Sequence, residues 1–271
     1  MSLLLAQIGR IIAHFLSQPL ADSFKPGTNN PEMLAATLKK GDVLLIEGNT
    51  RFSMAIKYLT QSSWSHSALY IGDALGKPDA GQEARVLLEA DINEGVRAVP
   101  LRQYADFHTR ICRPVGLSGE ELSRIMDHVL ARLGQRYDLK NIADLMRYFV
   151  QHPPVPIRWR RRLLALGSGD PTRAICSSLI AEAFQSINYP ILPEIEERLS
   201  NNPDCMPCYE EILHIRHHSL FVPRDFDVSP YFQIIKPTLE QGFDFHRLTW
   251  ERESNCEAAQ AIPSFVALEQ Q

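Results

Sequence analysis

The sequence predicts an α+β fold, in which a β-rich half of the chain is followed by a helical half. Short apolar runs bounded by turn residues dominate residues 42–115, whereas runs with helical spacing dominate from residue 118 onward. No internal repeat or long low-complexity tract interrupts this order. The chain has 271 residues, of which 45% are hydrophobic, so it is long enough to bury a sizeable core.

The β-rich half contains five predicted strands and one helix. Residues 42–47 (DVLLIE) form an apolar run between two glycines and predict a buried strand. A short helix is expected over residues 51–60, because apolar residues recur there at helical spacing. The other predicted strands cover residues 64–71, 86–90, 95–101 and 109–115.

The second half is mostly helical. Ser118, followed three residues later by Glu121, is a capping-box pattern and predicts a helix that runs to Leu133. Beyond residue 190 the sequence predicts mostly irregular structure, because prolines punctuate it. The remaining predicted elements are helices over 138–150 and 175–187, and a strand over 231–235 that adds to the core.

Charge and cysteine content narrow the functional classes. A net charge of -4 and a pI near 6.1 give no electrostatic sign of nucleic-acid binding. The five cysteines are an odd number, which favours reduced thiols and a cytoplasmic protein over a disulfide framework. An arginine-rich run at residues 158–162 is typical of a solvated loop, with an anion site as the alternative.

The N-terminal residues predict an amphipathic helix. Gln7, Arg10 and His14 break the apolar run, so no span of about 20 apolar residues exists. The pattern of a signal peptide is also missing. The helix either packs on the protein's own core or lies on a membrane surface. The predicted regions are this helix with a Pro/Gly/Asn-rich linker (1–37), a core (38–190) and a C-terminal extension that packs on the core (191–271).

Cys176 is a candidate nucleophile because it stands at the start of a predicted helix. The free N–H groups and the macrodipole at a helix N-terminus stabilise a thiolate, which is the nucleophilic form of cysteine. The same N–H groups can hold a developing oxyanion. The alternative is a small buried apolar residue, which is what most free cysteines are.

A thiolate nucleophile also needs a neighbouring base, and His66 and Glu89 are the candidates. His66 lies in the alternating segment WSHSALY, where a histidine is more often a core residue than a base. Glu89 is the single carboxylate in the next apolar run, where an unpaired charge is costly. If the two strands are neighbours, Glu89 can accept a hydrogen bond from His66 and fix its tautomer.

Five short motifs in this order resemble the circularly permuted branch of the NlpC-type papain-fold superfamily. Each motif alone is weak, but the ordered set over residues 38–190 is specific. The motifs are Gly41-Asp42-Val43, Ser62-Ser63-Trp64-Ser65-His66-Ser67, Leu88-Glu89-Ala90 with Glu94-Gly95-Val96, Gly134-Gln135-Arg136-Tyr137-Asp138, and Ile175-Cys176-Ser177-Ser178-Leu179.

The resemblance implies a papain-like, circularly permuted fold, in which an antiparallel half-barrel of six strands packs against helices. It implies cleavage or transfer at an amide, ester or thioester through an acyl-enzyme intermediate. By this resemblance Cys176 matches the nucleophile, His66 the general acid/base and Glu89 the group that orients it. Tyr137 matches a tyrosine near the pocket, and Trp64 and Ser177 are predicted to contact the substrate beside it.

The expected substrate is a small peptide, an amino-acid amide, or a lipid or acyl compound, and no cofactor is expected. A cell-wall substrate is disfavoured, because no secretion signal or wall-binding repeat is recognisable. The alternative function is a non-catalytic lipid- or peptide-binding module that associates with a membrane surface. Cys205 and Cys208, with nearby histidines, resemble a zinc site by residue type, but their spacing favours a loop.

Overall fold

The computed structural model describes residues 17–19, 30–91, 93–135, 176–199, 209–247 and 249. The chain divides into two compact units, Met1–Gln241 and Gly242–Gln271. The second unit contains one short 3-10 helix, η3 (Phe245–Arg247), among its described residues. All other elements belong to the first unit.

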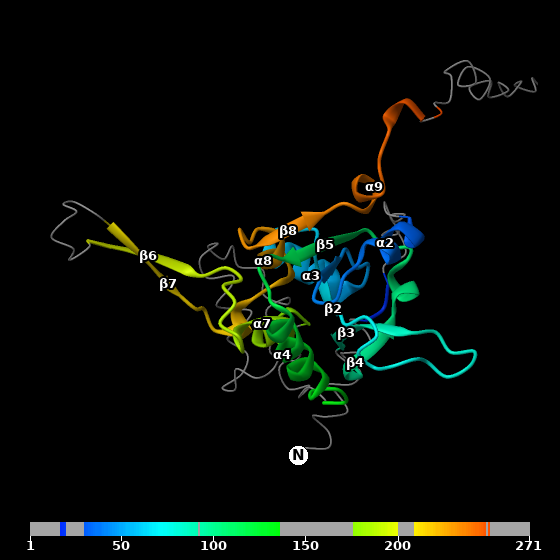
Figure 1. Ribbon diagram of the computed structural model, residues 1–271, viewed down its shortest axis with the longest axis horizontal. Coiled ribbons are helices and arrows are strands. Elements are labelled where there is room, and N and C mark those ends of the chain that lie inside the picture. Colours follow the sequence, from blue (N-terminus) through cyan, green and yellow to red (C-terminus); the bar gives the residue numbers. More distant parts are fainter. Residues whose placement is uncertain are drawn as a thin grey trace, which may run out of the picture. The chain divides into compact units, whose positions relative to one another are not determined.

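A six-stranded antiparallel sheet in the order β4-β3-β2-β1-β5-β8 forms the centre of the first unit (Figure 1). The α+β class and the predicted antiparallel sheet of six strands packed against helices are thereby confirmed. The strands are β1 (Val43–Ile46), β2 (His66–Tyr70), β3 (Arg85–Asp91), β4 (Gly95–Pro100), β5 (Thr109–Pro114) and β8 (Phe232–Ile235).

The central strand β1 is buried on both of its faces, as its unbroken apolar sequence predicts. Val43 and Leu45 belong to one hydrophobic cluster, and Leu44 and Ile46 belong to the other. Because successive side chains of a strand point to opposite faces, these two clusters are the two faces of the sheet.

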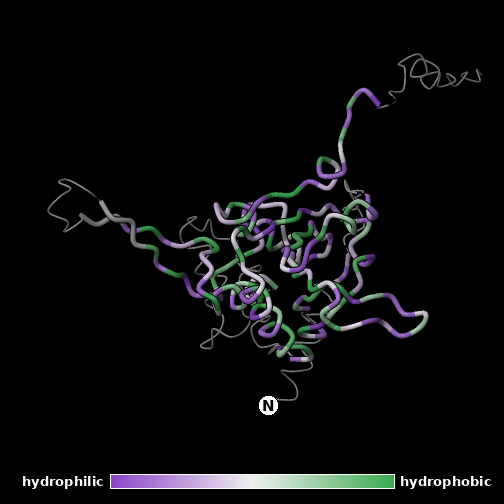
Figure 2. The backbone as a smooth tube through the Cα atoms, in the orientation of Figure 1, coloured by the Kyte–Doolittle hydropathy of each residue, from purple (hydrophilic) through white to green (hydrophobic). Residues whose placement is uncertain are grey.

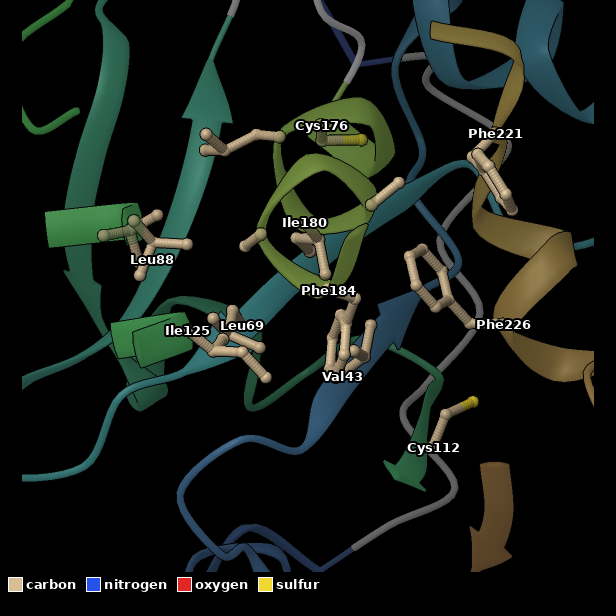
Figure 3. Close-up of a cluster of buried hydrophobic side chains, with 14 of the residues drawn as sticks. Val43, Leu69, Leu88, Cys112, Ile125, Cys176, Ile180, Phe184, Phe221 and Phe226 are labelled. Atoms are coloured by element: carbon tan, nitrogen blue, oxygen red, sulfur yellow. The ribbon is translucent and has the colours of Figure 1, made fainter. Parts of the chain in front are cut away.

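Two helices cover the first face, α4 (Gly119–Leu130) and α7 (Cys176–Gln185), which contact each other. The predicted capping box at the start of α4 is present. Ile180 and Phe184 of α7 point toward the strands that carry Val43 and Leu69 (Figure 3). Hydrophobic residues, green in Figure 2, gather where the helices and the sheet pack together.

The second face is covered by α2 (Pro31–Thr37) and the 3-10 helix η1 (Leu101–Tyr104). Asn30 caps α2, since its side chain accepts hydrogen bonds from the first backbone N–H groups of the helix. The predicted helix α3 (Arg51–Thr60) joins β1 to β2 and is capped in the same way by Thr50.

The late part of the chain is more regular than the sequence predicts. The predicted strand near residues 231–235 is confirmed as β8, which pairs with β5. The hairpin β6–β7 was missed, because strand formers are scarce in its Glu-rich first strand and only the cross-strand pairing reveals it. Its strands, and the other late elements, are β6 (Glu194–Leu199), β7 (Tyr209–His214), η2 (His218–Leu220), α8 (Pro223–Asp227) and α9 (Pro237–Glu240).

Some predictions fall outside the described residues. These are the N-terminal amphipathic helix, the helix over 138–150, the arginine-rich run, Tyr137, Cys205 and Cys208.

Candidate active site

Cys176 is the first described residue of α7 and is 5% exposed. Figure 3 shows its side chain at one end of the helix, with Ile180 and Phe184 following along α7. α7 packs on β2, which begins at His66. The fold therefore brings together two residues that are more than a hundred positions apart in the sequence.

His66 lies within hydrogen-bonding reach of Cys176 and of Glu89. Its Nε2 is 3.0 Å from Oε2 of Glu89, which leaves Nδ1 as the ring nitrogen that can face the sulfur. Burial lowers the pKa of His66, but Cys176 and Glu89 outweigh this effect and raise it well above the usual value. Cys176 and Glu89 therefore both favour the protonated imidazole.

The pKa of Cys176 moves in the opposite direction. Burial raises it, but the charge and hydrogen bond of His66 and hydrogen bonds from Ser67 outweigh burial, so the net pKa lies below that of an ordinary thiol. The two shifts describe one coupled pair, a thiolate beside an imidazolium. That ion pair is the resting form that a cysteine nucleophile needs.

Glu89 is 1% exposed and is held by several donors. Its Oε2 accepts from His66 and from the Tyr104 hydroxyl, and its Oε1 accepts from Nε of Arg97 at 2.9 Å and from Gln103 at 3.4 Å. Burial raises the pKa of Glu89, but these partners, with His66 first, lower it to about 2. The carboxylate therefore stays ionised while His66 changes its protonation state.

Sequence reasoning missed the three residues that hold Glu89 opposite His66. Arg97 is directly across from Glu89 in the β3–β4 pair, and Tyr104 and Gln103 come from η1. The usable signal was the short turn between β3 and β4, since counting back from it places Glu89 opposite Arg97. No local sequence pattern predicts that η1 contacts the carboxylate of Glu89.

Trp64 lies beside this site but is 4% exposed. Its indole N–H donates to Asp227 at 3.0 Å, its ring stacks on His108 at 5.2 Å, and Arg110 lies 4.9 Å from its ring centroid. These contacts join the residues just before β2 to β5 and α8. Contact between Trp64 and a substrate stays a prediction.

Ser177, the neighbour of Cys176, is fully buried, and its hydroxyl donates to the carbonyl of Phe221 at 2.8 Å. This bond anchors the start of α7 to the segment before α8. A substrate-binding role for Ser177 likewise stays a prediction, as does that of Tyr137.

The described residues contain no group of three or more His, Cys, Asp or Glu side chains arranged to hold a metal ion. Cys112, the other described cysteine, is fully buried in the core, and burial raises the pKa of its thiol. None of the helices among the described residues is long and apolar enough to cross a membrane.

Comparison with known proteins gives a family match and a similar solved structure. A family model described as "Permuted papain-like amidase enzyme, YaeF/YiiX, C92 family" matches residues 37–149, which include His66, Glu89 and the strands β1 to β5. A crystal structure described as metalloprotein yiiX from Escherichia coli O157:H7 is similar with 16% sequence identity and a TM-score of 0.40. That similarity covers 73% of this chain and 96% of the other. No curated protein matches the chain significantly in sequence.

Residues 37–149 are therefore similar to the permuted papain-like amidase family, and the six-stranded antiparallel sheet is consistent with that similarity.

Proposed function

We propose that the protein is a cysteine hydrolase that cleaves an amide bond, or a related ester or thioester, through an acyl-enzyme intermediate on Cys176. One observation carries the proposal: the His66 ring lies between a buried, ionised carboxylate and a buried thiol at the start of a helix. The family description as an amidase supports the same reaction class.

The proposed reaction begins with attack of the Cys176 thiolate on the substrate carbonyl carbon. The first backbone N–H groups of α7 hold the oxyanion that develops. The imidazolium of His66 then donates its proton to the leaving amine, the C–N bond breaks, and a thioester remains on Cys176. In the second half, neutral His66 takes a proton from water, and the resulting hydroxide attacks the thioester and releases the acid.

Glu89 acts in this scheme by orientation and charge. Because its pKa is about 2, it does not take a proton from His66 during turnover. It fixes Nε2 of His66 as the nitrogen turned away from the sulfur, and it stabilises the imidazolium.

The nucleophile can be tested without knowing the substrate. Iodoacetamide should alkylate Cys176 faster than Cys112 near neutral pH, because the pKa of Cys176 is lowered and that of Cys112 is raised. His66→Ala should slow alkylation of Cys176 and leave Cys112 unchanged, as measured by mass spectrometry of the peptides. Equal rates at the two cysteines, or no effect of His66→Ala, would contradict the proposal.

The reaction itself is tested with a panel of acyl amides, thioesters and short peptides. Cys176→Ala should abolish turnover, whereas Cys112→Ala, the matched control, should retain it. Trapping of a mass adduct on Cys176 with a slow substrate would identify the acyl group. If Cys176→Ala turns over the same substrate as fast as the wild type, the covalent mechanism is wrong.

The N-terminal segment is proposed to touch a membrane surface. Backbone and side-chain bonds join Gln18, which follows the N-terminal segment in sequence, to Arg51 at the start of α3. Met54 and Tyr58, one turn apart on α3, are 46% and 63% exposed. An amphipathic N-terminal sequence and an exposed pair of apolar side chains on a helix are both features of membrane-surface contact.

Co-sedimentation with anionic liposomes tests this contact. Binding should fall when residues 1–16 are removed, and also in the double variant Met54→Ser, Tyr58→Ser. Met33→Ser, on α2, serves as the control. Equal binding by all four proteins would remove the membrane contact from the proposal.

A further inference from the structure

We propose that Ser67 is a thiolate-stabilising residue, whose hydroxyl and backbone N–H both donate hydrogen bonds to the sulfur of Cys176. The inference rests on the proposed function, in which Cys176 is the nucleophile. Ser67 is not among the residues that the sequence motifs assign to the reaction.

Ser67 lies on the face of the sheet that packs against α7. It follows His66 in β2, so its side chain points to the opposite face of the strand. Leu69 and Ile71, which share that face, belong to the hydrophobic cluster that includes Cys176 and the rest of α7. The strand therefore presents His66 on one side of the sulfur and Ser67 on the side where α7 packs.

The hydroxyl of Ser67 has no conventional partner other than the sulfur toward which it is proposed to donate. Ser67 is fully buried, and its Oγ has no hydrogen-bond partner of standard geometry among the residues that the structure describes. Ser65, two positions earlier on the same face, is also buried, but its Oγ accepts from the N–H of Gly48 at 3.0 Å. Buried polar groups in folded proteins are nearly always paired, so an unpaired one indicates a function.

The strand pairing around Ser67 determines where its backbone N–H points. β2 pairs with β1 as far as His66, but it pairs with β3 only at Leu69 and Tyr70. Backbone groups in an antiparallel sheet bond alternately to the two neighbouring strands, and Ile71 donates to β3. By the same alternation, the N–H of Ser67 points to the β3 side, beyond the last paired residue, and is free to meet the sulfur.

The electrostatics agree with this placement. After burial and the effects of His66, the hydrogen bonds from the N–H and the hydroxyl of Ser67 are the next influences on Cys176, and both lower its pKa. A hydroxyl that donates to a neutral thiol gains little, whereas one that donates to a thiolate makes a charge-assisted bond. The hydroxyl therefore favours the ionised sulfur, and no other acceptor bonds it among the residues that the structure describes.

The test is the pH dependence of Cys176 alkylation by iodoacetamide in the full-length protein. In Ser67→Ala the midpoint of the profile should move up by about one pH unit, which lowers the rate roughly tenfold at pH values below both midpoints. The rate at high pH should stay the same or rise slightly, because a less stabilised thiolate is more nucleophilic. Ser65→Ala, which loses a structural bond, should keep the wild-type midpoint.

Thermal unfolding provides the second readout. Ser67→Ala should lower the melting temperature near neutral pH, where the thiolate loses a donor, and should leave it unchanged at a pH below the wild-type midpoint, where the thiol is neutral. Ser65→Ala should lower the melting temperature at both pH values. A wild-type midpoint in Ser67→Ala, with or without a lower melting temperature, overturns the inference about Ser67. Failure of the proposed function looks different: the wild-type midpoint itself would match an ordinary thiol, and His66→Ala would not move it.

Discussion

The buried carboxylate of Glu89 offers the sharpest test of the site's electrostatics, by the substitution Glu89→Gln. This change keeps the shape of the side chain and removes its charge. The charge is 1% exposed and is paired with Arg97, whose Nη2 is 2.9 Å from Oε1. Removing one partner of a buried ion pair is strongly destabilising, because the other partner stays buried without compensation.

The expected magnitude follows from the pKa of Glu89. Its fall from 4.5 to about 2 on folding corresponds to about 3 kcal/mol of stability above pH 4.5. Because the folded-state pKa is the lower one, this stability is present at neutral pH and is lost as the pH falls through the range from 4.5 to about 2. Glutamine mimics the protonated acid, so the variant should lack this pH-dependent component.

The assay is urea unfolding of the wild type and Glu89→Gln at several pH values. The free energies of unfolding should differ by about 3 kcal/mol near pH 6 and converge toward pH 2. Glu94→Gln is the matched control, since Glu94 also bonds Arg97, at 2.8 Å, but is 65% exposed. A gap that stays constant as the pH falls, or that Glu94→Gln reproduces, would refute the account of Glu89.

Three further substitutions test the framework that positions the site. Gly41→Ala should cost about 1–3 kcal/mol in urea unfolding, because Gly41 has a φ of +94° and a new Cβ would lie 2.7 Å from Cδ1 of Leu122; an unchanged midpoint would contradict this. Arg113→Gln should cost about 3–5 kcal/mol, because Arg113 binds the buried Asp42 through two nitrogens at 2.8 and 2.7 Å; a loss typical of a surface pair, below about 1 kcal/mol, would argue against it. Phe226→Ala should cost about 3–5 kcal/mol by thermal or urea unfolding, because its side chain is fully buried, and a smaller loss would mean that the core collapses into the cavity.

Local patterns were sufficient for most elements of the sheet and its helices. The unbroken apolar run at β1, the capping box at Ser118 and the helical spacing after Cys176 each depend on neighbours within a few residues. Such signals survive in a single sequence because helix and strand periodicities are local. The β6–β7 hairpin was missed for the converse reason, since its strands are recognisable only as a pair.

For the candidate active site, too, some features could be predicted from the sequence and others required the structure. Sequence patterns predict Cys176, His66 and Glu89 as site residues. Contact between His66 and Glu89 requires that their strands, β2 and β3, be neighbours. The structure meets this condition and places His66 3.0 Å from Glu89. The roles of the three residues in a reaction stay predictions for the alkylation and turnover experiments.

The sequence by itself determined the residue types, the strands and the helix start that a cysteine hydrolase needs. Only the tertiary structure decided which groups share one buried space: Arg97 and Tyr104 around Glu89, and Ser67 beside Cys176. These contacts depend on strand register and on how helices return to the sheet. Register and packing are fixed by burial summed over distant segments, so no local pattern encodes them.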